Sequence, residues 1–268
     1  MTFNGENGMK RRSLLLMMMV AEVLITACSA GGNKASTEKK TLVAGTEGTM
    51  FPWTYVEDNK IVGFEADIIA EISKRTGYDI EMKAMDWSGL FGNLDAKRVD
   101  TVANIVTITD ERKEKYVFTQ PYVYNPMVLA TKADSDINSL DDIDGRTIVV
   151  EVGSSDEMVL KQLEDGLGVD LEPVYYEGIS ITDVENGRVD LWIGGEPSLN
   201  TNIEAGYDLK IIGQTGSYQE YGYPFLIGGE GEELCSVFDN ALTEMKKDGT
   251  LKNISEKWFK MDITQKPE

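Results

Sequence analysis

The sequence predicts an α/β protein made of two similar units that face each other across a cleft. Short apolar runs alternate with segments of helical periodicity from residue 41 onward. The tripeptide Arg-Val-Asp, followed each time by an apolar strand, occurs at Arg98 and again at Arg188. A pair of helical segments closes the chain. Alternation of strands and helices is typical of a parallel or mixed sheet that helices cover on both faces.

The first unit begins with a short buried strand at residues 41–45. Residues 64–76 carry apolar side chains at helical spacing and are followed by Gly77, a common helix C-cap. A strand at residues 78–82 comes next, and Asp86 is a candidate N-cap for another helix. The strand after the first Arg-Val-Asp completes this unit.

The second unit begins with a helical turn near residues 139–145. A strand at residues 147–152, the turn Gly153-Ser154-Ser155 and a helix to about Leu163 follow, with further strands at residues 174–176 and 189–193. Residues 232–247 have one apolar helical face, and a short helix with Trp258 and Phe259 ends the chain. In both Arg-Val-Asp copies we expect the valine in the core and the aspartate in a turn, with no ligand contact.

The first 27 residues have the pattern of a signal peptide. Three basic residues at positions 10–12 precede apolar runs that end in Ile-Thr-Ala-Cys. This ending resembles a bacterial lipobox, so Cys28 is the candidate lipidation site, and residues 28–40 are polar enough to form a flexible tether. An uncleaved membrane anchor is the alternative, but the run is shorter than the ~20 apolar residues that span a bilayer. The sequence therefore predicts an extracytoplasmic body that contacts the membrane only through a lipid anchor.

The composition argues against several classes of function. The chain has 26 basic and 46 acidic residues, which disfavours nucleic acid as a partner because phosphate binding needs cationic side chains. Histidine is absent, which excludes Ser-His-Asp and Cys-His nucleophiles and His-ligated zinc. The acidic run before Gly145 is not a calcium loop, because Leu140 stands at its obligatory first acidic position. We expect no metal, no cofactor and a small buried apolar role for Cys235.

The strand after the first Arg-Val-Asp leads to Asn104, Thr107 and Arg112. Arginine suits a carboxylate ligand, because its planar guanidinium forms paired, charge-assisted hydrogen bonds and keeps its proton. The alternative is a surface arginine that pairs with Glu111 or Glu114. In the second unit, Ser154 and Ser155 precede a helix, whose free N–H groups favour an anion.

Three further side chains complete a candidate site for a zwitterion. Glu47 follows the first strand and suits an ammonium group, whereas Trp53 and Trp87 offer apolar faces. The alternative for both tryptophans is a place in the core.

Ordered motifs give the chain a resemblance to a known family over residues 42–259. They are Gly-Thr-Glu-Gly-Thr-Met-Phe-Pro-Trp, Gly-Phe-Glu-Ala-Asp, Asp-Trp-Ser-Gly-Leu, Ile-Thr-Asp-Glu-Arg, Phe-Thr-Gln-Pro-Tyr, Ser-Leu-Asp-Asp-Ile-Asp-Gly and Lys-Asp-Gly-Thr-Leu…Lys-Trp-Phe. The set resembles the family 3 extracellular solute-binding proteins, the polar amino-acid receptors of ATP-binding-cassette (ABC) importers. The resemblance implies a two-lobed periplasmic-binding-protein type II fold with a hinged cleft. We expect one lobe from residues 41–130 plus 227–268 and the other from residues 131–226.

The resemblance also implies a role for each candidate residue. Arg112 would bind the α-carboxylate with help from Asn104 and Thr107, and Ser154 and Ser155 would cap it from the other lobe. Trp87 would pack on the ligand side chain, Met50 stands where a second aromatic is usual, and Glu47 would contact the α-ammonium group.

One position departs from the family pattern. Gly195 stands where the family has an aspartate that binds the ammonium group, and Glu196 is next to it. Either Glu196 substitutes, or Glu47 acts alone, or the ligand is not a standard α-amino acid. The segments around Glu47 and Asn104 are most similar to the cystine-binding branch.

The sequence therefore predicts a monomeric receptor without catalytic residues. It would capture a small amino acid, polar or cystine-like, by lobe closure and deliver it to an ABC permease in the cytoplasmic membrane. An enzyme on the same fold, with Glu151, Glu177 or Glu196 as its acid, and a ligand-sensing module remain the alternatives.

Overall fold

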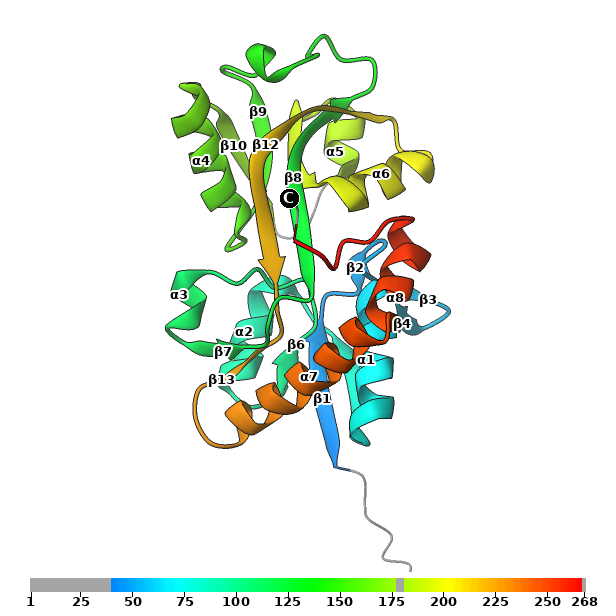
Figure 1. The fold of residues 1–268 in the computed structure, drawn as a ribbon. Coiled ribbons are helices and arrows are strands. Elements are labelled where there is room, and N and C mark those ends of the chain that lie inside the picture. The colour runs from blue at the N-terminus through cyan, green and yellow to red at the C-terminus, as the bar shows by residue number, and fades with distance from the viewer. Residues whose placement is uncertain (1–39, 177–180, 267–268) are drawn as a thin grey trace, which may run out of the picture. The chain divides into compact units, whose positions relative to one another are not determined.

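The computed structural model describes residues 40–176 and 181–266 (Figure 1). Its strands are β1 (Thr41–Thr46), β2 (Thr49–Met50), β3 (Thr54–Glu57), β4 (Lys60–Val62), β5 (Asp79–Ala84), β6 (Thr101–Val102), β7 (Tyr116–Phe118), β8 (Val123–Lys132), β9 (Thr147–Glu151), β10 (Glu172–Tyr176), β11 (Leu191–Gly195), β12 (Leu209–Tyr221) and β13 (Pro224–Leu226). Its helices are α1 (Phe64–Thr76), α2 (Trp87–Asp95), α3 (Asp110–Lys113), the 3-10 turn η1 (Leu140–Asp142), α4 (Asp156–Leu167), α5 (Ile181–Glu185), α6 (Glu196–Glu204), α7 (Glu230–Lys247) and α8 (Thr250–Phe259).

These elements form two lobes, each with its own sheet (Figure 1). The first lobe contains the parallel sheet β5-β1-β6, with α1, α2, α7 and α8 around it. The second contains the mixed sheet β10-β9-β11-β8-β12, in which β8 is antiparallel to both neighbours. Apolar clusters lie on both faces of this second sheet. The predicted α/β class with two units is confirmed.

Two long antiparallel strands, β8 and β12, run from one lobe to the other (Figure 1). Their pairing begins at Leu209 and Lys132 in the second lobe and ends at Tyr221 and Val123 next to the first. The register shifts between Gln214 and Tyr218, so the pair bends where it crosses. The structure thus has the crossing connection expected for a hinged pair of lobes, and the exact boundaries at residues 130/131 and 226/227 stay a prediction.

The repeated Arg-Val-Asp has the same structural role in both lobes. Asp100 accepts a hydrogen bond from the backbone N–H of Val43 in β1 (2.7 Å), and Asp190 accepts one from Thr147 in β9 (2.9 Å). The valines that precede the two aspartates are 2% and 3% exposed. Each copy therefore ties a turn to the neighbouring parallel strand, as the core-and-turn interpretation predicts.

Several local predictions can be compared directly with the elements. Gly77 ends α1 in the left-handed conformation (φ 78°). Cys235 is buried on α7, where burial raises the pKa of its thiol to about 12. Asp86 occupies the N-cap of α2, but its side chain forms no capping hydrogen bond with the described residues. The strand after the first Arg-Val-Asp is only two residues long, because the backbone turns at Ile105 (φ 46°).

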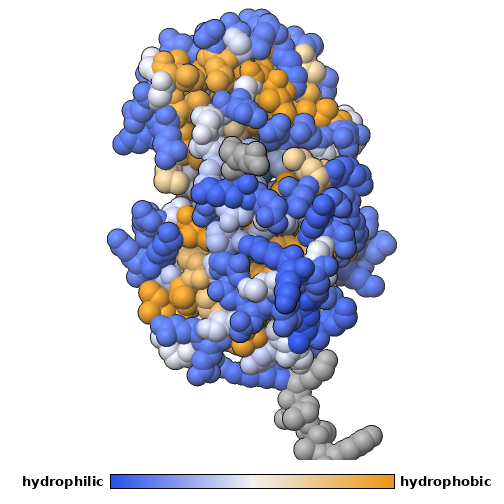
Figure 2. Space-filling view, viewed as in Figure 1, coloured by the Kyte–Doolittle hydropathy of each residue, from blue (hydrophilic) through white to orange (hydrophobic). Residues whose placement is uncertain are grey.

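Some predictions fall outside the described residues. They concern the signal peptide, the lipidation site Cys28, nearly all of the tether and the candidate acid Glu177. No helix in the described part of the chain is long and apolar enough to cross a bilayer. On the face shown in Figure 2, hydrophilic residues predominate in the first lobe, and apolar residues gather mainly on the second.

Candidate functional site

A cavity of about 700 Å³ lies where the two lobes and the crossing strands meet. Both lobes and both crossing strands contribute to its wall. Nine of the ten predicted ligand-binding residues line it, namely Glu47, Met50, Trp53, Trp87, Asn104, Thr107, Arg112, Ser154 and Ser155. Its size is in the range usual for small-molecule sites.

Arg112 is held with its guanidinium group at this cavity. Its backbone N–H donates to Oγ1 of Thr109 (3.2 Å), the N-cap of α3. Its Nη1 donates to the carbonyl of Thr107 (2.9 Å), and Nη2 reaches the carbonyl of Gly153 in the other lobe (3.4 Å). Within the described residues no ion pair joins Arg112 to a carboxylate. The guanidinium therefore carries a positive charge that its carbonyl partners do not neutralise.

Two aromatic rings support this guanidinium from the side. Its Cζ lies 5.2 Å from the ring centroid of Phe91 and 5.6 Å from that of Trp87, and the two rings meet edge to face. Such contacts favour a cation and restrict its orientation. Burial lowers the pKa of Arg112, although arginine remains charged at neutral pH. Phe91 is a contributor that no sequence motif indicated.

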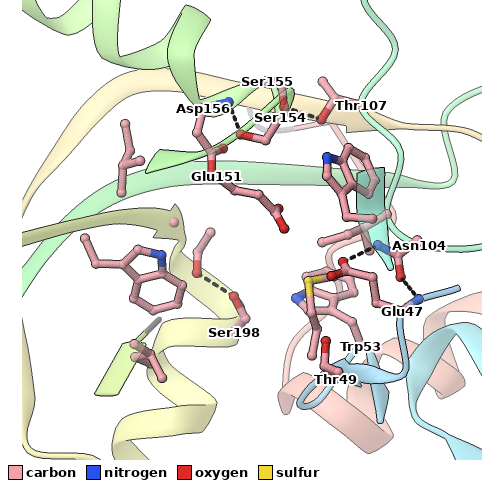
Figure 3. A pocket seen from close by; sticks show the side chains of 18 of the residues that line it. Glu47, Thr49, Trp53, Asn104, Thr107, Glu151, Ser154, Ser155, Asp156 and Ser198 are labelled. Atoms are coloured by element: carbon pink, nitrogen blue, oxygen red, sulfur yellow. Dashed lines mark hydrogen bonds between the residues drawn. The ribbon is translucent and has the colours of Figure 1, made fainter. Parts of the chain in front are cut away.

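The N-terminus of α4 faces the first lobe across the cavity (Figure 3). Oγ of Ser155 is 2.8 Å from Oγ1 of Thr107 and accepts from Nε2 of Gln219 (2.9 Å). Oγ of Ser154 accepts from the backbone N–H of Asp156 (3.1 Å). Ser155 therefore connects the second lobe to the first and to a crossing strand, and the helix dipole adds a partial positive charge beside Arg112.

Asp156, in the first turn of α4, is a carboxylate that sequence reasoning missed. Burial raises its pKa to about 6, against the opposing effects of hydrogen bonds from Gln219 and Ser154 and of the charge of Arg112. The side chain lines the cavity. Its charge at neutral pH opposes any anion bound at Arg112.

Glu47 is positioned by Asn104 (Figure 3). Nδ2 of Asn104 donates to Oε2 of Glu47 (2.9 Å), while its Oδ1 accepts from the backbone N–H of Glu47 and from Thr46 (2.9 Å each). Burial raises the pKa of Glu47, and the hydrogen bond from Asn104 opposes this shift. Asn104, only 2% exposed, thus has a supporting position behind Glu47.

The segment between Asn104 and Thr107 is anchored by a buried acid. Ile105 has φ 46°, a conformation that is costly for a β-branched residue. Its N–H donates to Oε1 of Glu65 (3.2 Å), and the hydroxyls of Tyr122 and Tyr223 also donate to this carboxylate. Burial raises the pKa of Glu65. This network holds the backbone in the turn that brings Asn104 and Thr107 to the cavity.

The three apolar candidates differ in exposure. Trp53 is 3% exposed and packs against Phe64, Tyr221 and Phe259, so it belongs mainly to the core beneath the cavity. Met50 is also buried. Trp87 is only partly buried and presents its ring at the wall.

Glu196 is the one predicted ligand-binding residue that does not line the cavity. It lies in the first turn of α6, where the helix dipole stabilises a carboxylate, and accepts from Nε2 of Gln214 (3.4 Å). The neighbouring Gly195 does line the cavity.

Several other lining residues have no sequence motif. Those with polar or aromatic side chains include Asn125, Glu151, Asp183, Trp192, Ser198, Asn202, Tyr207, Gln219 and Tyr221. Glu151 was named above only as a candidate acid, and the others come from several elements far apart in the chain, so only the general rule that ligands bind beyond strand ends pointed to them. Within residues 40–176 and 181–266 no group of three or more acidic or cysteine side chains is placed to hold a metal ion.

Residues 42–261 match the model of the bacterial extracellular solute-binding proteins, family 3. The chain belongs to this family.

Members with known or assigned ligands share most of the chain. The L-cystine-binding protein TcyJ of Escherichia coli K12 is 34% identical over 235 residues, which cover 85% of this chain and 86% of TcyJ. An ancestral arginine-binding protein bound to arginine superposes with a TM-score of 0.73 at 33% identity, over 82% of this chain and 99% of that one. A structure described under glutathione import via GshT and the cystine ABC importer TcyBC of Streptococcus mutans superposes with a TM-score of 0.76 at 26% identity, over 85% and 98%. As a member of this family, the chain is a solute-binding protein with a two-lobed fold.

Proposed function

We propose that this solute-binding protein captures an amino acid, polar or cystine-like, and delivers it to an ABC permease of the cytoplasmic membrane. The observation that carries the proposal is the unneutralised guanidinium of Arg112 at the cavity, opposite the N-terminus of α4. A carboxylate between them would gain paired hydrogen bonds and a favourable dipole. Glu47, from the same lobe as Arg112, would take the ammonium group.

The binding event would be closure of the lobes without chemistry. Contacts such as Thr107 to Ser155 already join the lobes, and a ligand that touches both would favour the closed form through its higher affinity for it. Cystine and arginine are the ligands named for the relatives above, and both are amino acids with a polar or charged distal group. Lipidation at Cys28 would hold the receptor at the outer face of the membrane.

A thermal-shift screen of the purified protein with L-cystine, L-arginine and L-glutamine tests this proposal. A ligand that binds only the folded state raises the melting temperature, by an amount that grows with its concentration over Kd. We expect a shift of the melting temperature with at least one of the three amino acids. That amino acid should be recovered chemically unchanged after the protein is denatured. No shift with any amino acid would contradict the proposal, and conversion of the ligand would favour an enzyme.

A further inference from the structure

Asn125 is a buried polar side chain in the cavity wall whose carbonyl oxygen lacks a partner. It lies on the crossing strand β8 and is 2% exposed. No donor among the described residues forms a hydrogen bond with its Oδ1. A buried acceptor without a partner costs free energy, which a donor from a ligand would recover.

The orientation of the Asn125 amide follows from a chain of hydrogen bonds. Nε2 of Gln219 donates to Oγ of Ser155 (2.9 Å), and Oε1 of Gln219 accepts from the hydroxyls of Thr107 (3.2 Å) and Tyr221 (3.0 Å). A hydroxyl has one proton, so Oη of Tyr221 must accept from Asn125, and Nδ2 lies 2.6 Å away. The Oδ1 atom is therefore the end of the amide that is left for another donor.

Gly195, at the end of β11, provides the room for this amide. A Cβ at position 195 would lie 2.1 Å from Nδ2 and 2.3 Å from Oδ1 of Asn125. The backbone of Gly195 is extended (φ −74°, ψ 130°), a conformation open to any residue, so space and not conformation requires the glycine. The Asn125 amide thus occupies the place that a side chain at position 195 would take, and both residues line the cavity.

The charge of the cavity indicates which kind of donor would fit. Among the described lining residues, one guanidinium, that of Arg112, accompanies a larger set of carboxylates, namely Glu47, Asp86, Glu151 and Asp156, whereas the lining carboxylate of Asp183 pairs with Arg188 (2.7 Å). This excess of negative charge favours a positively charged donor at the neutral Asn125 acceptor.

We propose that Oδ1 of Asn125 accepts a hydrogen bond from the amino group of the bound amino acid, and that Gly195 is needed because it leaves room for this acceptor. The inference rests on the proposed amino-acid ligand and adds the residue that distinguishes an amino acid from the same acid without its amine. The acceptor comes from the crossing strand, so recognition of the amine is built into the connection between the lobes.

The test compares Asn125→Ala with the wild type by isothermal titration, using pairs of ligands that differ only in the amine. The pairs are L-arginine with 5-guanidinopentanoic acid, L-glutamine with glutaramic acid, and L-cystine with 3,3′-dithiodipropionic acid. For the amino acid that the wild type binds, we expect Asn125→Ala to weaken binding about 10- to 100-fold, the range for a hydrogen bond to a charged group. Affinity for the partner without the amine should change less than about threefold, as should both affinities in the control Asn200→Ala, an exposed position on α6.

Two further variants test the part of Gly195. Gly195→Ala should weaken binding of the amino acid as much as Asn125→Ala does. The double variant Asn125→Ala/Gly195→Ala should lose no more affinity than either single variant. Asn125→Ala combined with Gly195→Asp returns an acceptor from β11 and should restore selectivity for the amine. Equal losses for both members of a ligand pair, or unchanged affinity in Asn125→Ala, would overturn the inference alone. A wild type that binds none of the amino acids would overturn the proposed function and this inference with it.

Discussion

At the residue scale, charges and hydrogen-bond partners decide what the cavity can bind. The guanidinium of Arg112 donates to two carbonyl oxygens and lies over two aromatic rings, but it pairs with no carboxylate among the described residues. Its charge is therefore available to a ligand. Glu47 has an amide neighbour that fixes its orientation without neutralising it. Separation of these two charges within one wall suits a zwitterion.

Replacement of Arg112 should abolish tight binding. Arg112→Ala would enclose the ligand carboxylate without its counter-charge, at a cost of about 2–5 kcal/mol, or roughly 30-fold or more in Kd. Arg112→Lys keeps the positive charge but loses the planar pair of N–H donors, so its affinity should lie between those of the wild type and Arg112→Ala. Isothermal titration measures the loss. Arg146→Ala removes a surface arginine that pairs with Asp136, and serves as the control that should bind normally. Wild-type affinity in Arg112→Ala would refute the role of Arg112.

At the scale of elements, tight turns place the wall residues. The turn before α1 is closed by hydrogen bonds from Phe64 to the carbonyl of Pro52 (3.0 Å) and from Glu65 to that of Trp53 (3.0 Å). Glu65 is in turn the acid that holds Ile105. The start of one helix therefore supports the turn that carries Asn104 and Thr107.

Gly63→Ala should destabilise the protein through this turn. Gly63 has φ 127°, and a Cβ there would lie 2.3 Å from the carbonyl oxygen of Trp53. We expect a loss of about 2–4 kcal/mol, which for a protein of this size lowers the melting temperature by roughly 4–16 °C. Gly77→Ala is the matched control, since Gly77 also has positive φ (78°) but no atom within 4 Å of its Cβ position. Its cost should be about 1 kcal/mol. Equal melting temperatures for both variants would show that the close approach to Trp53 does not matter.

At the scale of the whole described body, two lobes with separate apolar clusters meet at contacts that include polar side chains. Each lobe has its own apolar core, whereas Thr107, Ser155 and Gln219 join the lobes through hydrogen bonds. Polar contacts exchange with water at little net cost, which suits lobes that must open and close.

Ligand binding should depend on pH through Asp156, a partly buried carboxylate in the cavity wall. Its pKa is raised to about 6, so the closed arrangement takes up a proton more readily than an exposed carboxylate. Falling pH through 6 should therefore favour closure and remove a negative charge beside the ligand carboxylate. We expect affinity to fall as pH rises from 5 to 7, by no more than about tenfold per unit because one proton is involved. Titrations of the wild type and Asp156→Asn across this range measure the effect, which the variant should lack. The same slope in Asp156→Asn would assign it to another group, such as Glu47.

Several helices and strands follow from local sequence, whereas the long crossing strands β8 and β12 and the helices α5 and α6 were not predicted. Apolar spacing identified the helices α1 and α7, and the glycine after α1 marked its end. Short apolar runs identified β1 and β9, and the repeated Arg-Val-Asp correctly indicated two similar units. The exception among them was the strand after Asp100, which ends at Val102. There the buried carboxylate of Glu65 stabilises a left-handed residue that local preference would not choose.

The sequence alone determined the fold class, the presence of two units and the cavity-lining residues that belong to local motifs, because each depends on spacing within one segment. Only the tertiary structure decided that Glu196 lies outside the cavity wall while Asn125, Asp156, Gln219 and Tyr221 lie within it. These residues meet because β8 and β12 cross between the lobes, which brings together side chains about a hundred positions apart. Whether a polar group is buried, paired or available to a ligand depends on such long-range neighbours. Local sequence patterns cannot predict which residues those neighbours are.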